Sequence, residues 1–125
     1  MANQNNFNPY NASAFNPYGT VSIASGATSS IASFTNTQSI GAACARIYHT
    51  ATVTVFVAFG IASVATPTAT TPSGTESSTS IPCPPSLTTV VIKGAGSDTV
   101  AAISAAAGTV YISAGEEANN AREGA

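Results

Sequence analysis

The stretch "TVTVFVAF", residues 52–59, indicates the fold class of this chain. Successive side chains of a β-strand point to opposite faces, so the segment places Val53, Val55, Val57 and Phe59 on one face. A helix repeats every 3.6 residues and would scatter these side chains around its axis. The period of two and the β-branched residues therefore predict a strand with one buried face.

A membrane-spanning helix is the alternative for this region, because residues 51–69 contain no charged residue. A spanning helix needs about 20 predominantly apolar residues. Here threonine alternates with valine at the start, and the run ends in Thr66-Pro67-Thr68. These features favour strands over a membrane span.

Six other segments are predicted as strands, and a seventh is either a short strand or a continuation past a bulge. Gly94, Gly96 and Gly108 are expected to supply positive φ in the turns between them. Thr50-Ala51 is predicted as a short hairpin link, and "GAGSD" at 94–98 as a hairpin turn. The six segments are 20–25, 28–35, 42–49, 87–93, 99–104 and 109–113, and the seventh is 61–66.

A helix is the alternative for "DTVAAISAAAG", residues 98–108, because alanine favours helices and Asp98 is an acceptable N-cap. Glycine turns flank the segment, and the next strand follows at hairpin distance. These flanks favour a strand.

Seven or eight short strands without a clear helix predict an all-β chain. The expected architecture is an antiparallel two-sheet β-sandwich, jelly-roll-like or immunoglobulin-like, with an extended N-terminal arm. The arm is expected at 1–19, the sandwich domain at 20–115 with a long loop at 67–86, and a polar tail at 116–125. Five of the seven prolines lie in that loop.

Charge is scarce in this chain. Only 6% of the residues are charged, against about 25% in typical soluble domains, and residues 1–45 carry no charge. Arg46, Lys93 and Arg122 are scattered, which excludes an electrostatic nucleic-acid footprint. A surface of hydroxyls and amides is easily desolvated and suits contact with other proteins. The N-terminus has no basic region or apolar run, so we expect synthesis in the cytoplasm without secretion.

Few residues could support catalysis or hold a cofactor. The chain has one histidine, five acidic residues and three cations, and no enzyme activity or cofactor is expected. His49 is predicted to be an edge or half-exposed side chain, although a base beside Ser or Thr is the functional alternative. Cys44 lies five residues from His49, an odd spacing that places the two on opposite faces of a strand, so no metal site is expected. Cys44 and Cys83 are expected as buried thiols, with a disulfide as the alternative.

Two short motif matches are interpreted as structural. "GAGSD" is a weak match to a phosphate-binding loop because no lysine follows it. "NAS" at 11–13 fits the glycosylation sequon, but a chain that is not secreted would not use it.

The tetrapeptide FNPY occurs twice, at 7–10 and 15–18, in an uncharged region. Proline holds the backbone extended, and two aromatic groups eight residues apart could reach two pockets of a neighbouring subunit. A dispensable, disordered N-terminus is the alternative. The predicted partner-binding residues are Phe7, Pro9, Tyr10, Phe15, Pro17 and Tyr18.

Residues 46–116 resemble a family of tailed-bacteriophage head proteins, the capsid cement or decoration proteins. The resemblance lies in "ARIYHTATVTVFVAFG", in the loop with "TTP" and "IPCPPS", and in "TVVIKGAGSDTVAAISAAAGTVYISAGEE". It implies a β-sandwich, often a jelly roll, that binds the outer surface of the head. The implied partners are the major capsid protein and copies of the chain itself, as a dimer or trimer, without nucleic acid or membrane.

Two other classes of function remain open. One is another phage structural component, such as a head-tail joining, head-fibre or tail protein. The other is a surface adhesin or carbohydrate-binding module, which predicts secretion and an exposed aromatic platform. The sequence shows no secretion signal and no tryptophan. The neighbouring genes would discriminate between a capsid cement protein and another phage structural component.

Overall fold

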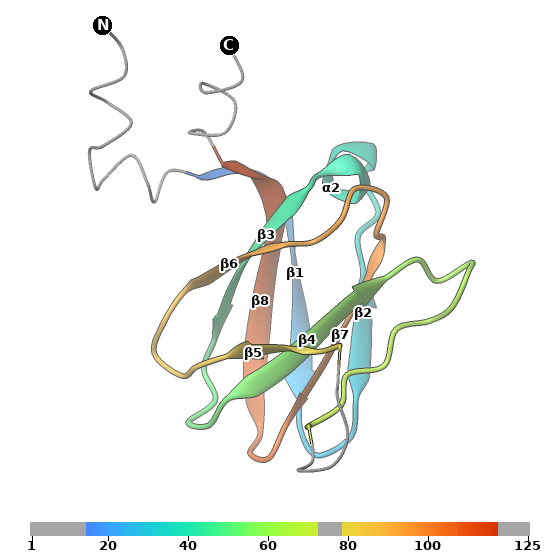
Figure 1. The fold of residues 1–125 in the computed structure, drawn as a ribbon. Helices are drawn as coiled ribbons and strands as arrows, with labels where there is room; N and C mark the ends of the chain where they lie inside the picture. Colours follow the sequence, from blue (N-terminus) through green and yellow to red (C-terminus); the bar gives the residue numbers. More distant parts are fainter. Residues whose placement is uncertain (1–14, 73–78, 118–125) are drawn as a thin grey trace, which may run out of the picture.

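The described residues fold into eight β-strands and one short helix (Figure 1). The structure is a computed structural model and describes residues 15–72 and 79–117. The strands are β1 (Phe15–Ser25), β2 (Ser30–Ser33), β3 (Cys44–His49), β4 (Val55–Gly60), β5 (Ile81–Cys83), β6 (Thr89–Ile92), β7 (Thr99–Ser104) and β8 (Gly108–Glu117), and the helix is α2 (Thr37–Gly41).

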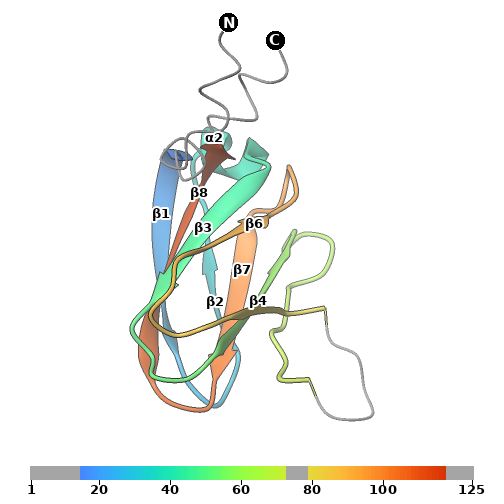
Figure 2. The ribbon, with the colours of Figure 1, turned by 60° about the vertical axis from the view of Figure 1, so that its left-hand side comes forward.

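The strands form two antiparallel sheets that pack face to face (Figures 1 and 2). Sheet A has the strand order β1-β8-β3-β6, and sheet B has the order β2-β7-β4-β5. Eight strands in this order form a jelly roll, in which all connections except that from β4 to β5 pass between the sheets. The predicted two-sheet sandwich and its jelly-roll topology are confirmed.

The predicted hairpins are wrong. The link after His49, the "GAGSD" turn and the link before Gly108 each join strands of different sheets. A short turn sequence fixes where the backbone reverses, but it does not determine which sheet receives the next strand. Burial of apolar faces between two sheets decides that, because the inner faces of both must be covered.

The core between the sheets is made of alternating valine, isoleucine and alanine side chains. Val55 and Val57 of β4 are fully buried, as predicted. β4 begins at Val55, three residues later than expected, so Val53 precedes the strand. Phe59 is half-buried. The other fully buried apolar residues are Ala45, Ile47, Cys83, Val100, Ala101, Ala102, Val110, Ile112 and Ala114.

Three features of the backbone differ from the prediction. β1 begins at Phe15, so the arm boundary at residue 19 is wrong. β5 lies inside the region predicted as a loop, and its Pro82 is tolerated because β5 is an edge strand. α2 is capped by Asn36, whose Oδ1 accepts a hydrogen bond from the Ser39 N–H at 2.6 Å. Residues 99–104 form β7, so the strand prediction holds over the helix alternative.

The two cysteines are buried thiols that belong to different sheets and are not joined by a disulfide. Burial raises the pKa of Cys83 to about 11. His49 is 2% exposed, which corrects the prediction of an edge or half-exposed side chain. Its Nε2–H donates to the carbonyl oxygen of Cys83 at 2.8 Å, a bond that joins sheet A to sheet B.

The turn between β6 and β7 is organised around the buried Lys93. Its Nζ donates hydrogen bonds to the carbonyl oxygens of Ile40, Gly94 and Ser97, at 2.9, 3.3 and 2.7 Å. Gly94 and Gly96 have φ of 89° and 94°, as predicted, whereas Gly108 does not have positive φ. Lys93 therefore ties the turn to the end of α2.

The stability of the protein is expected to depend on pH through the carboxyl group of Asp98, which lies at the end of this turn. Hydrogen bonds from the Ala62 N–H and the Thr99 hydroxyl lower the pKa of its carboxyl group. A lowered pKa contributes stability that is present above the unfolded value of about 4 and is lost as pH falls through the folded value. Asp98→Asn keeps an acceptor but cannot titrate. We expect thermal unfolding by circular dichroism to show a small deficit for Asp98→Asn at pH 7 that shrinks towards pH 2. An unchanged difference across this range would contradict the assignment.

Candidate functional site

The outward side of sheet A carries an exposed group of large side chains. In β3, Ala45, Ile47 and His49 point into the core, so Arg46 and Tyr48 point outwards. The strand register places neighbours from β8 and β6 beside them on the same side. We call the following set the outer face of sheet A: Phe15, Arg46, Tyr48, Val90, Ile92 and Tyr111.

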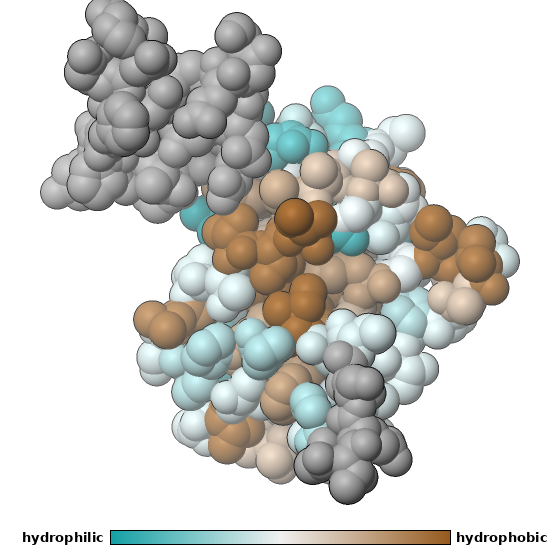
Figure 3. Space-filling model, in the orientation of Figure 1, coloured by the Kyte–Doolittle hydropathy of each residue, from teal (hydrophilic) through white to brown (hydrophobic). Residues whose placement is uncertain are grey.

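Four members of the outer face are exposed apolar or aromatic residues. Ile92 is 79% exposed, Tyr48 47%, Tyr111 43% and Val90 41%. Figure 3 shows hydrophobic residues gathered over β6, and separately on the loop after β4. Neighbouring exposed apolar side chains on one face mark an interaction surface more often than single ones do.

Tyr48 and Tyr111 form an aromatic pair on this face. They lie directly opposite each other in the β3–β8 register, with ring centroids 6.5 Å apart and an interplanar angle of 21°. Cross-strand aromatic pairs stabilise a sheet, and their polar hydroxyls let the rings stand in water. The pair forms a rigid, half-exposed aromatic platform.

Arg46 and Phe15 form the second part of the outer face. The guanidinium carbon of Arg46 lies 5.0 Å from the centroid of the Phe15 ring, in a cation–π arrangement. The ring lies over Gly115, where an added Cβ would come within 2.8 Å of Phe15 Cε2. The bare backbone at Gly115 thus makes room for the aromatic ring on the sheet.

The second FNPY tetrapeptide is part of the sandwich. Phe15 and Pro17 pair with Glu117 and Gly115 of β8, and an irregularity in the register follows between Pro17 and Gly19. Tyr18 packs against the core, and its carbonyl oxygen accepts a hydrogen bond from Asn36 Nδ2 at 3.1 Å. The other predicted arm residues, Phe7, Pro9 and Tyr10, lie outside the described residues, as does the "NAS" sequon.

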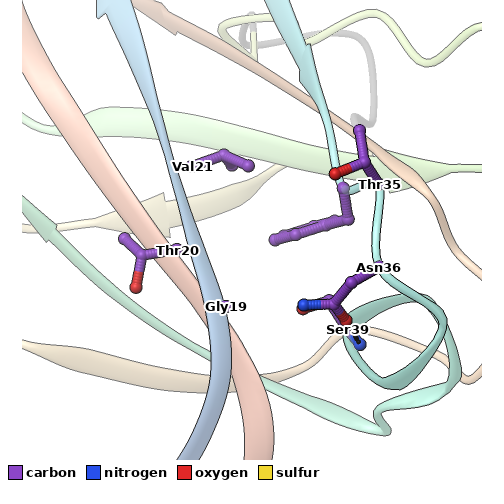
Figure 4. A pocket seen from close by; sticks show the side chains of 7 residues that line it. Gly19, Thr20, Val21, Thr35, Asn36 and Ser39 are labelled. Atoms are coloured by element: carbon purple, nitrogen blue, oxygen red, sulfur yellow. Dashed lines mark hydrogen bonds between the residues drawn. The ribbon is translucent and has the colours of Figure 1, made fainter.

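A small cleft lies between β1 and the segment that leads into α2 (Figure 4). Asn36 and Ser39 point across it toward Gly19, and Ser39 Oγ is buried without a hydrogen-bond partner among the described residues. The volume of the cleft is about 80 Å³, whereas small-molecule sites usually measure about 300–1,000 Å³. The cleft holds a few water molecules at most. Its lining residues are Gly19, Thr20, Val21, Phe34, Thr35, Asn36 and Ser39.

Within the described part of the chain, no group of three or more His, Cys, Asp or Glu residues is placed to hold a metal ion. Among residues 15–72 and 79–117, no helix is long and apolar enough to span a membrane.

Sequence reasoning did not identify Tyr48, Val90, Ile92 and Tyr111 as site residues. A signal was present for the two tyrosines, because Tyr48 and Tyr111 each lie between two buried residues of their strand. The pairing of β3 with both β8 and β6 was needed to bring them together. Arginine and tyrosine suit an interface because both residue types are enriched at binding hot spots.

The described residues form an eight-stranded jelly roll with an exposed apolar and aromatic surface on sheet A. Comparisons of the chain with protein-family models, curated proteins and solved structures returned no match.

Proposed function

We propose that this chain is a structural virion protein that binds the outer surface of a phage head and cements neighbouring major capsid proteins. The observation that carries the proposal is the outer face of sheet A, with its exposed Ile92, Tyr48 and Tyr111. Jelly rolls are common in viral capsid proteins, and the strand patterns of residues 46–116 resemble the head-decoration family. In this proposal the protein is made in the host cytoplasm and resides on the outer capsid surface.

The chemistry of the outer face suits a protein partner. Burial of an exposed side chain such as Ile92 contributes up to roughly 1.5–3 kcal/mol, and tyrosine and arginine are enriched at interface hot spots. Arg46 is the one charged residue of the six that define the face. Binding driven by apolar burial should therefore depend only weakly on ionic strength.

Head binding is tested with heads that lack the protein, assembled from a major capsid protein of the same genome. We expect saturable co-sedimentation with these heads, with similar affinity at low and high salt. Ile92→Ser should weaken binding about tenfold because it removes apolar contact area. Ile31→Ser is the matched control, because Ile31 is 52% exposed on β2 of sheet B.

Heads that fail to bind the unmodified protein would contradict the cement role. Binding to isolated tails or to the head-tail junction instead would assign it to another virion component. Electron microscopy of the bound particles distinguishes these positions directly.

Carbohydrate binding is the second candidate function, and the Tyr48–Tyr111 platform is the observation that favours it. Jelly rolls also occur in lectins. Two half-exposed rings with an interplanar angle of 21° present an apolar surface flanked by hydroxyls. Retention on insoluble polysaccharide that Tyr111→Ala abolishes would support this function over the cement role.

A further inference from the structure

The repeated tetrapeptide provides the starting point, because the structure shows how one of the two copies is bound. Residues 15–18 lie along β8, with the Phe15 ring over Gly115 and beside Arg46. Pro17 precedes the irregularity in the register, and Tyr18 packs against the core. The second copy of the tetrapeptide thus places its phenylalanine ring on the outer face of sheet A while its backbone pairs with β8.

Residues 7–10 have the same four side chains in the same order. Each chain fills the Gly115 position with its own Phe15, but the rest of the outer face stays exposed. Tyr111 lies four residues from Gly115 along β8, which is about 13 Å in a strand. Tyr48 lies directly opposite it, whereas Val90 and Ile92 lie farther along the face, opposite Arg46 and Cys44 of β3.

We propose that residues 7–10 of a second copy of this chain bind the outer face of sheet A at the Tyr48–Tyr111 pair. This inference takes one element from the proposed function, which is that copies of the chain are partners of one another. Phe7 and Tyr10 supply rings for the tyrosine pair, and Pro9 holds the segment extended. Neither the segment nor the tyrosine end of the face carries charge, so no ion has to be desolvated.

The direction of β1 favours a second copy over the same molecule. β1 is antiparallel to β8 and starts at Phe15 opposite Glu117, whereas Tyr111 lies opposite Ser22. The backbone at Phe15 therefore points past the end of β8, away from Tyr111. Glu117 and Tyr111 are six residues apart, about 20 Å along a strand, whereas the five residue steps from Tyr10 to Phe15 span about 17 Å when extended and leave no length for a reversal.

The short spacer also limits the geometry of the assembly. Five residue steps separate Tyr10 from Phe15, which span about 17 Å when extended. The outer face of the neighbour must lie within this distance. Reciprocal exchange then gives a closed dimer or trimer, in which each copy donates one segment and receives one.

Sedimentation of the full chain without heads tests this inference. We expect reversible self-association that weakens about tenfold or more in Phe7→Ala/Tyr10→Ala and in Tyr48→Ser/Tyr111→Ser. The exposed Ile31 on β2 again provides the control, and Ile31→Ser should associate like the unmodified chain.

Mixing the two double variants provides the decisive measurement. Each variant alone associates weakly, but one retains an intact face and the other an intact segment, so the mixture should form mixed complexes that are tighter than either variant forms alone. A monomeric full chain at all concentrations, or a mixture that stays monomeric, would overturn the inference. Undiminished association of Phe7→Ala/Tyr10→Ala would overturn it as well.

Head binding by the same variants separates the inference from the proposed function. A chain that binds heads but never self-associates contradicts the inference alone. A chain that self-associates through this contact but binds no heads contradicts the cement role alone.

Discussion

Val55→Asp is expected to unfold the protein. Val55 is fully buried in β4, between Ser104 of β7 and Cys83 of β5. An unpaired carboxylate at this position costs several kcal/mol, against a total stability of roughly 5–15 kcal/mol for a domain. The purified variant should show no cooperative thermal transition by circular dichroism, and its near-ultraviolet signal should be lost.

The matched control is Val64→Asp, because Val64 is 79% exposed on the loop after β4. The same chemical change at this position should leave the melting temperature almost unchanged. A soluble Val55→Asp protein with an unchanged transition would contradict the burial and the register of β4.

Gly108→Ala should produce the second large loss of stability. Gly108 opens β8 where the connection from β3 to β4 passes, and an added Cβ would lie 2.7 Å from the backbone nitrogen of Ala51. Two hydrogen bonds between Thr50 and Thr109, at 3.0 and 2.9 Å, hold these backbones together. Relief of the clash must move backbone, so we expect a loss of about 1–3 kcal/mol or more.

Gly41→Ala separates this steric effect from a general effect of replacing glycine. No atom lies within 4 Å of a Cβ built at Gly41, and its φ is not positive. Its melting temperature should stay the same or rise slightly, because alanine is the better helix former. For Gly108→Ala, chemical denaturation should show a lower midpoint with an unchanged slope. Equal stability of the two variants would contradict the close approach at Ala51.

The alternation of side chains predicted much of the sandwich. Inward Ala45 and Ile47 and inward Val55 and Val57 follow from the period of two, which is a property of the strand itself. Strand pairing could not be predicted in the same way, because a turn such as "GAGSD" carries no information about the next sheet. The role of Gly108 was misjudged for a similar reason, since it depends on Ala51, which is distant in sequence.

The short elements and the candidate site were harder to predict. β5 has three residues in a proline-rich segment, and α2 has five, so neither is long enough to show a period. Asn36 was an available signal for a helix start. The outer face combines Tyr48 of β3, Tyr111 of β8 and Ile92 of β6, and only the strand pairing shows that they share one side of sheet A.

The pairing of β1 with β8 has a consequence for synthesis on the ribosome. Phe15 pairs with Glu117, so at about 5–20 residues per second the start of β1 waits on the order of 5–20 s for its partner. During this time an uncharged, apolar segment leaves the ribosome without the strand that will cover it. Nascent chains on neighbouring ribosomes of one messenger RNA are then close enough to pair with each other. The cell must therefore keep this chain from aggregating before its last strand is made, and holdase chaperones that bind extended apolar segments are suited to do so.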